Sequence, residues 1–101
     1  MSATHYGASY NGQRMGCAPY NAYSSYDTTI AAIGTQHYAQ WPCGTTLEVS
    51  GPNGTIYAIR QDSCPGCDLR YPNMIDLSEA GHAIVCGVGT CRVQVTVVSN
   101  D

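Results

Sequence analysis

The sequence contains no lysine and no phenylalanine, and only 11% of its residues are charged. Its four cations are all arginines, spread along the chain without a cluster, and the formal net charge is -3. A weakly acidic chain without a basic patch attracts neither nucleic acid nor anionic lipid, so neither is an expected partner. No apolar run approaches the roughly 18 residues of a transmembrane helix, and no charged-then-apolar start resembles a signal peptide. We therefore expect a mature or recombinant form without a membrane span.

Cysteine and tyrosine, by contrast, are abundant, with six cysteines and eight tyrosines in 101 residues. This length predicts one domain over residues 1–101, and so many cysteines favour an oxidised, secreted protein with three disulfides. Among the possible pairings we favour two local clasps, Cys64–Cys67 and Cys86–Cys91, and one long closure, Cys17–Cys43. The long closure would contribute about 3 kcal/mol and would stabilise an N-terminal half that is poor in aliphatic residues.

The segment Cys64-Pro65-Gly66-Cys67 has two alternative interpretations. A redox pair is typically found at a helix N-terminus in a βαβ context, whereas here Asp68 follows at once and would oppose a thiolate. A zinc site needs a second ligand pair at comparable spacing. Because the remaining cysteines lack that spacing and the histidines are scattered, we interpret the cysteines as structural and expect neither metal nor cofactor. The histidines are His5, His37 and His82.

Alternating apolar and polar residues predict strands in the second half of the chain. Thr45–Ser50 and Thr55–Gln61 form a hairpin pattern, and Asn53-Gly54 between them is the favoured pair for a two-residue turn with positive φ. Further strands are expected at Ala3–Ser9, within an extended N-terminal segment covering residues 1–12, at Thr28–Ile33 and at the valine-rich Arg92–Ser99.

One short helix is expected over Glu79–Val85. Ser78 can cap its N-terminus, and the Glu79 carboxylate interacts favourably with the helix dipole. Gly81 weakens such a helix by about 1 kcal/mol, so it should be short and end near Gly87. These elements together predict a mostly β barrel or sandwich with one or two short helices.

Two carboxylates flank the cysteine loop. Asp62 ends a strand pattern, and Asp76 lies where the helix pattern begins. Paired acids beside a cross-linked loop are typical of a glycosidase-like site. Both also have ordinary structural uses, since Asp76 could help to cap the helix and Asp62 could pair with Arg60 or Arg70. His82 is expected to pack or to face solvent rather than to act in catalysis.

Six motifs follow one another along the chain, namely Ile30–Ile33, Pro42–Thr45, Leu47–Gly54, Ile59–Cys67, Ile75–Ser78 and the closing valine-rich strand. In series they resemble the double-psi β-barrel superfamily, which includes the first domain of expansins, barwin-like proteins, rare lipoprotein A and inverting endoglucanases. The resemblance covers roughly Thr28 to Val98 and implies a six-stranded double-psi β-barrel with one or two short helices, stabilised by disulfides. In size, lone barrel domain and tyrosine-rich, lysine-free N-terminal half, the chain also resembles the small papain inhibitors of streptomycetes.

The resemblance implies that Asp62 and Asp76 line a groove. In the endoglucanase pattern Asp76 would donate a proton to a glycosidic oxygen, and a base about 6.5–9.5 Å away would hold a water. Expansins resemble this site but lack a working base, and they loosen polysaccharide without cutting it. In rare lipoprotein A a histidine precedes the Pro-x-Gly-Thr motif. Here Tyr38 falls at that position, and His37 is one residue away, on the opposite face if the segment is a strand. This difference argues against peptidoglycan cleavage.

We predict a secreted inhibitor of papain-like cysteine proteases rather than an enzyme. A rigid barrel would present a narrow edge to the protease cleft, and its pre-organisation would reduce the entropy lost on binding. Glycines would allow close approach at that edge. The expected inhibitory surface comprises Thr4, Tyr6, Tyr10, Asn11, Gly12, Gly87 and Gly89.

Other functional classes remain as alternatives. The first is an expansin-like binder of wall polysaccharide, in a groove lined by Asp62, Asp76, Tyr6 and Tyr71, with Tyr10 as a further stacking platform. The second is a small hydrolase or lytic transglycosylase that uses the same acids. The third is a role as glutamine donor to a transglutaminase, since the chain has five glutamines and no lysine. A monomer is expected throughout. The glutamines are Gln13, Gln36, Gln40, Gln61 and Gln94.

Overall fold

The computed structural model describes residues 1–17, 22–67 and 73–99, so the predictions that involve Arg70 or Tyr71 lie outside it. Its strands are β1 Ser2–Tyr6, β2 Ile30–Ile33, β3 Thr46–Ser50, β4 Thr55–Ser63, β5 Met74–Ser78, β6 Cys91–Arg92 and β7 Gln94–Ser99. Its helices are α2 Glu79–Cys86 and the short 3-10 helices η1 Ala8–Tyr10 and η2 Thr35–His37. Within this part of the chain, no helix has the length and apolarity needed to cross a membrane.

The strands form one mixed sheet in the order β6-β1-β5-β2-β4-β3-β7, which curls into a nearly closed barrel. β6 and β7 are separated only by Val93 and lie at opposite edges of the sheet, where β6 pairs with β1 and β7 pairs with β3. Val93 also exchanges hydrogen bonds with Met1, 2.8 and 3.0 Å long, which extends the pairing with the first strand. The closing segment therefore counts as two strands, which is why seven are present where six were predicted.

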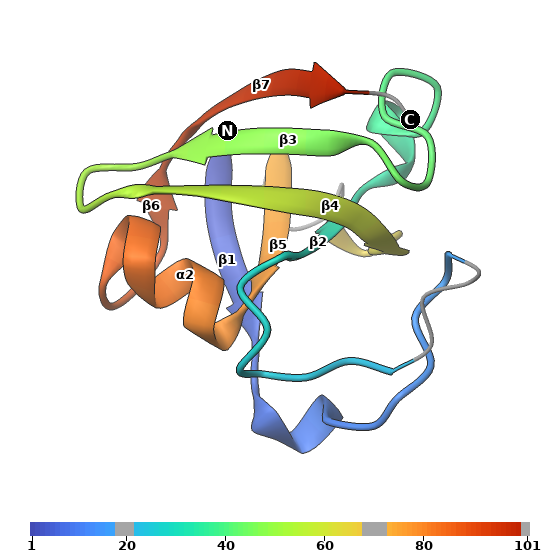
Figure 1. Ribbon diagram of the computed structural model, residues 1–101, viewed down its shortest axis with the longest axis horizontal. Coiled ribbons are helices and arrows are strands. Elements are labelled where there is room, and N and C mark those ends of the chain that lie inside the picture. Colours follow the sequence, from blue (N-terminus) through green and yellow to red (C-terminus); the bar gives the residue numbers. More distant parts are fainter. Residues whose placement is uncertain (18–21, 68–72, 100–101) are drawn as a thin grey trace.

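Two parallel pairs, β1 with β5 and β2 with β4, lie in this otherwise antiparallel sheet. In Figure 1, β3, β4 and β7 run across one side of the barrel, and β1 and β5 cross it at a steep angle. Alternate residues of these strands point inward, as a strand period of two requires. The buried core consists of Ala3, Ala31, Ile33, Trp41, Leu47, Val49, Ile56, Ala58, Ile75, Leu77, Val85, Cys86 and Val93.

The predicted β3–β4 hairpin is present, but its turn differs from the prediction. Ser50 and Thr55 form the last pair, so the loop has four residues rather than two. Neither Asn53 nor Gly54 is among the residues with positive φ. The loop instead packs on α2, where the Asn53 N–H donates to the Val85 carbonyl at 3.0 Å. The close approach of the loop to the helix therefore fixes its shape.

Helix α2 begins and ends as its capping residues predict. The Ser78 hydroxyl accepts a hydrogen bond from the Gly81 N–H at 3.1 Å, and Gly87 ends the helix with a φ of 74°. Gly81 has a packing role that the sequence did not reveal. A Cβ there would lie 3.1 Å from the Ile56 side chain and 3.3 Å from the Thr28 carbonyl, so glycine lets the helix approach the barrel closely.

Residues 6–17 and 22–29 form what we call the tyrosine-rich segment, which covers one side of the barrel. Only Ser2–Tyr6 of the predicted extended N-terminus is a strand, because η1 turns the chain after Gly7. A small second core joins Met15, Tyr23 and Ile30, with the Tyr6 ring stacked on Tyr23 at a centroid distance of 4.0 Å. The Tyr23 hydroxyl donates to the Tyr6 carbonyl and accepts from the Glu79 N–H at 3.2 Å. Polar and aromatic contacts thus connect this segment to the barrel.

Three disulfides are present, and they join the pairs favoured from the sequence: Cys17–Cys43, Cys64–Cys67 and Cys86–Cys91. The Cys17–Cys43 disulfide joins Cys17 of the tyrosine-rich segment to the turn that precedes β3. Beside it, the Cys17 N–H donates to the Gln61 carbonyl at 3.0 Å.

Candidate functional site

Four residues form a row across neighbouring strands on the outer wall of the barrel. Thr4 in β1 pairs with Asp76 in β5, Asp76 pairs with Ala32 in β2, and Ala32 pairs with Asp62 in β4. The residues that alternate with them, including Ala31 and Ile33, belong to the core, so the row itself faces outward. The two predicted acids are therefore brought together, with the small side chain of Ala32 between them.

A β-bulge turns Asp62 to this outer wall. Ala31 pairs with Arg60 and Ala32 with Asp62, which leaves Gln61 as an extra residue in β4. Before the bulge, even-numbered residues such as Ala58 face the core, and a regular strand would have carried position 62 inward as well. The amide of Gln61 is buried and donates to the Thr29 carbonyl at 2.9 Å, which satisfies the bulged residue.

Three hydrogen bonds hold the Asp62 carboxylate. Its Oδ1 accepts from the backbone N–H groups of Gly16 at 2.7 Å and Ser63 at 2.8 Å, and its Oδ2 accepts from the Tyr6 hydroxyl at 3.3 Å. A Cβ at Gly16 would lie 3.3 Å from the Ser63 hydroxyl and 3.4 Å from Asp62 Oδ1, so glycine suits this close approach. No sequence signal indicated the Gly16 anchor, because it comes from a loop 46 residues away.

Asp76 lies within β5 and not at the start of the helix, which corrects the expectation from the sequence. β5 was missed because residues on both of its faces are largely buried, so the segment lacks the alternation of a half-exposed strand. The Thr4 hydroxyl donates to Asp76 Oδ1 at 2.8 Å. Asp76 thus projects from the middle of a central strand, where its backbone position is well defined.

Three residues of this row, Ala32, Asp62 and Asp76, form the floor of a groove of about 440 Å³. Tyr6 and Tyr10 from the tyrosine-rich segment form one side, and the disulfide-clasped turn beginning at Cys64 forms another. Burial and then the neighbouring carboxylates Asp62 and Asp76 raise the pKa of the Tyr6 hydroxyl, which therefore stays protonated and able to donate. The lining residues are Tyr6, Tyr10, Gln13, Arg14, Ala32, Asp62, Ser63, Cys64, Pro65, Gly66 and Asp76.

Arg60 does not pair with the Asp62 carboxylate. Its guanidinium donates instead to the Asp62 backbone carbonyl at 3.1 Å, to the Ser63 hydroxyl at 2.8 Å and to Cys43 Sγ at 3.0 Å, and it lies over the Tyr38 ring. Arg60 therefore stabilises the backbone around the bulge and leaves the carboxylate to the groove.

The histidines lie away from the groove. His37 is in η2 and stacks on Trp41 at a centroid distance of 4.6 Å, so the expected strand geometry for His37 and Tyr38 is wrong. His82 is only 2% exposed and lies against His5 at 4.6 Å, in keeping with the packing role expected for it. None of the three histidines lines the groove.

Cysteine chemistry is restricted by the disulfides. Within the described residues, one group has ligand atoms mutually within 4.8 Å, namely Cys64, Cys67 and Asp76. Both thiols are consumed in the Cys64–Cys67 disulfide, so this group has no thiolate to offer a metal ion in the oxidised protein.

The residues predicted to inhibit a protease come from three segments, namely β1, η1 with the residues after it, and the loop after α2. Thr4 and Tyr6 belong to β1, which pairs with β5 along its whole length, and both also belong to the groove row or its wall. Tyr10, Asn11 and Gly12 are exposed at the end of η1. Gly87 and Gly89 flank Val88 in the loop after α2, and both have positive φ.

No family model matches the chain, and no curated protein matches it. Among solved structures, the apo form of an expansin from Clavibacter michiganensis matches with a TM-score of 0.71 and 27% identity, over 99% of this chain and 50% of that one. An aspartate-to-asparagine mutant of that expansin, in complex with cellohexaose, matches with a TM-score of 0.69 and 25% identity, over 97% and 48%. The Streptomyces papain inhibitor matches with a TM-score of 0.61 and 25% identity, over 93% and 89%.

The fold is a double-psi β-barrel. The match to expansin and to the papain inhibitor agrees with the resemblance that the six sequence motifs had indicated. This double-psi β-barrel spans about half the length of the expansin and most of the papain inhibitor. No matched structure gives support to a transglutaminase partner.

Proposed function

We propose that this double-psi β-barrel binds a wall polysaccharide of the β-linked glucan class without cutting it. The binding site would be the groove lined by Asp62, Ala32 and Asp76, which we call the carboxylate groove. The observation that carries the proposal is the row formed by Asp62, Ala32 and Asp76, which places two outward carboxylates on either side of a small residue. This preference reverses the order drawn from the sequence, where the protease inhibitor came first. The reason is that both acids line one groove, whereas the predicted inhibitory residues are spread over β1, η1 and the loop after α2.

The chemistry of the groove suits a sugar chain. Carboxylate oxygens accept hydrogen bonds from sugar hydroxyls, and such charge-assisted bonds are stronger than neutral ones. Tyr6 and Tyr10 add aromatic surface with polar tips, and Arg14 adds donors at the rim. The matched expansin structure in complex with cellohexaose supports the choice of a glucan as ligand class. The three disulfides fit an oxidising, extracellular setting in which a wall polymer would be met.

Binding without hydrolysis is favoured by how the acids are held. Asp62 and Asp76 are two strand spacings apart in the sheet, about 10 Å between Cα atoms, with Ala32 between them. An inverting mechanism would need a carboxylate free to activate a water. Asp62 already accepts three protein hydrogen bonds, which suits it to be a fixed acceptor rather than a base.

Titration with cellohexaose, together with pull-down on insoluble cellulose, tests the proposal. We expect Asp76→Asn to weaken binding about tenfold or more, since a charge-assisted hydrogen bond is lost. Glu48→Gln is the matched control, because Glu48 is a carboxylate on β3 that bonds Tyr57 outside the groove. Equal binding by Asp76→Asn and wild type, or release of reducing ends by wild type that stops in Asp76→Asn, would contradict the proposal.

Inhibition of a papain-like cysteine protease is a second candidate function, and one observation favours it. Val88 is 95% exposed at the tip of a loop closed by the Cys86–Cys91 disulfide. Its neighbours Gly87 and Gly89 both have positive φ, so the backbone on each side is compact and sharply turned. A single apolar side chain on a pre-organised loop suits insertion into a protease pocket. The papain inhibitor that matches over 89% of its own length is consistent with this use of a lone barrel.

Residual papain activity at rising concentrations of the protein tests this candidate, with a trypsin-type protease alongside. Stoichiometric loss of papain activity that Val88→Asp abolishes would support it. Val98→Asp is the control, since Val98 is another exposed valine, on β7. Full papain activity at large excess of the protein would exclude inhibition and leave the groove proposal untouched.

A further inference from the structure

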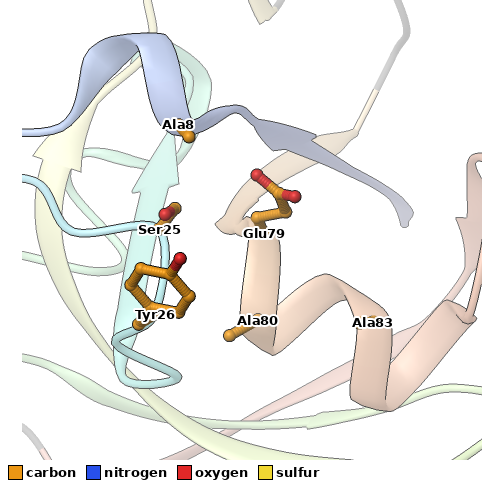
Figure 2. Close-up of a pocket in the computed structure, with 6 residues that line it drawn as sticks. All are labelled: Ala8, Ser25, Tyr26, Glu79, Ala80 and Ala83. Carbon is orange, nitrogen blue, oxygen red and sulfur yellow. The ribbon is translucent and has the colours of Figure 1, made fainter.

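A second cavity, of about 220 Å³, lies between η1, the chain at residues 25–26 and the first two turns of α2. Figure 2 shows Ala8 on one side, Ser25 and Tyr26 opposite the start of the helix, and Glu79 at the rim. Its volume is below the roughly 300–1,000 Å³ of small-molecule sites, so it suits a single side chain rather than a cofactor or an oligosaccharide. Ala8 and Tyr10 lie at opposite ends of η1, which separates this cavity from the carboxylate groove.

Hydrogen bonds within the protein hold the walls of this cavity in place. The Ala80 N–H donates to the Ser25 carbonyl at 2.9 Å, which fixes the chain at residue 25 against the helix. The Ser25 N–H donates to Asn11 Oδ1 at 2.6 Å, and the Asn11 amide donates to the Ser25 hydroxyl at 3.2 Å. The cavity is therefore pre-formed, and an occupant would not have to order its walls.

Apolar methyl groups line the cavity, while its rim carries one aromatic ring and one charge. The methyl groups come from Ala8, Ala80 and Ala83. The Tyr26 side chain is 85% exposed, which leaves a ring face open to a partner. Glu79 is exposed, and no arginine of the described residues forms an ion pair with it. An apolar slot that ends beside an aromatic face and an exposed carboxylate complements a side chain with an apolar stem and a cationic head.

We propose that this cavity receives an arginine side chain of a partner protein. The methylene stem would pack on the three alanines, and the guanidinium would lie on the Tyr26 ring and hydrogen-bond the Glu79 carboxylate. Arginine fits better than lysine, because its planar guanidinium can stack on a ring and donate two hydrogen bonds to one carboxylate. The chain's net charge of -3 adds a weak general attraction for such a partner.

Nuclear magnetic resonance titration of the intact protein with N-acetyl-arginine amide tests the site. We expect saturable shifts of the Ala8, Ala80 and Ala83 methyl signals, with a dissociation constant on the order of millimolar for one side chain. N-acetyl-citrulline amide has nearly the same shape without the charge and should bind at least about threefold more weakly, as the loss of an exposed ion pair implies. Equal responses to the two compounds, or shifts outside the cavity, would overturn the proposal.

Two variants test separately how the charge and the shape of the cavity contribute to arginine binding. Glu79→Gln should weaken arginine binding at least about threefold, and Ala83→Leu should abolish it by filling the slot. Glu48→Gln is the matched control, since Glu48 bonds Tyr57 and does not line the cavity, so this variant should bind arginine as the wild type does. Unchanged binding in Glu79→Gln would refute the assignment. If the protein self-associates and Glu79→Gln abolishes the association, the partner is a second copy of this chain.

Discussion

The two sides of this double-psi β-barrel are built by different means. The side formed by β3, β4, β7 and α2 is held by apolar residues that repeat every second position along the strands and by backbone ladders. The tyrosine-rich segment buries only a small cluster, in which Met15 and Tyr23 pack with Ile30 of β2. It is attached by the Cys17–Cys43 disulfide and by hydrogen bonds between side chains and backbone. The first side depends on hydrophobic packing, and the second depends on a few specific links.

The groove lies where the barrel strands meet the tyrosine-rich segment. Asp62 and Asp76 project from barrel strands, so their backbone is fixed by the sheet. Tyr6 and Tyr10, which line the groove, and Gly16, whose amide holds Asp62, belong to the tyrosine-rich segment. A rigid floor with a wall held by few links can keep its charges in place while the wall adjusts to a ligand.

Removal of the long disulfide should separate the two sides most clearly. The double variant Cys17→Ser/Cys43→Ser should lose about 3 kcal/mol of unfolding free energy in urea, because the unfolded chain is no longer cross-linked. Hydrogen exchange should quicken at the Gly16 and Cys17 amides well before it does in β3. If hydrogen exchange quickened equally on both sides, the segment and the barrel would unfold as one unit. That result would contradict the difference between the two sides.

The barrel side was predictable from sequence because its signals are local. Alternation identified the hairpin strands and the closing strand, and Ser78 with Gly87 identified the limits of α2. The turn at Asn53 was predicted wrongly, because its shape follows from contact with α2, which neighbouring residues do not encode. β5 was missed since burial of both its faces hides the period of two.

The groove was predictable from the sequence as a pair of acids with tyrosines beside them, and Tyr6 and Tyr10 do line it. Asp62 and Asp76 were chosen for their motifs, and the sheet register places them in one row on either side of Ala32. The bulge at Gln61, the small spacer Ala32 and the amide of Gly16 could not be foreseen. Each depends on a strand or loop distant in sequence, and a one-residue change of register reverses which face a side chain occupies.

A methyl group at Gly51 should damage the barrel side by overpacking. An added Cβ would lie 2.4 Å from the Val85 carbonyl oxygen, which belongs to the helix backbone and cannot easily move. We expect Gly51→Ala to lower the unfolding free energy by about 2 kcal/mol, while cellohexaose binding stays unchanged. Gly7→Ala is the control, since a Cβ there meets nothing within 4 Å. If the two variants were equally stable, close packing of the hairpin on α2 would not be what holds this side together.

Loss of one hydroxyl should weaken the tyrosine-rich segment more modestly. Tyr23→Phe removes a donor to the Tyr6 carbonyl and an acceptor for the Glu79 N–H, which should cost about 1 kcal/mol. Burial raises the pKa of Tyr23, so its stabilising contribution is present below pH 10 and is lost as the pH rises above that value.

Urea unfolding at neutral and alkaline pH, with Tyr57→Phe as the control, measures both effects of the Tyr23 hydroxyl. Tyr57 is 58% exposed and its hydroxyl bonds only to the Glu48 carboxylate among the described contacts, so its loss should change stability little. A Tyr23→Phe protein that matches the wild type at neutral pH would mean that ring packing alone attaches the segment.

The smallest expected effect is a pH dependence at the contact between α2 and β1, where His82 packs against His5. Burial, and then the nearby His5, lower the pKa of His82, whose Nε2 has no hydrogen-bond partner. The unfolded chain therefore binds a proton at a higher pH than the folded chain, and stability should decline as the pH falls below 6.5. The urea midpoint should fall between pH 7 and pH 5 in the wild type, but less in His82→Gln. His37→Gln, which alters a histidine in η2, should keep the full decline, because His37 is only half-buried and lies outside the contact between α2 and β1.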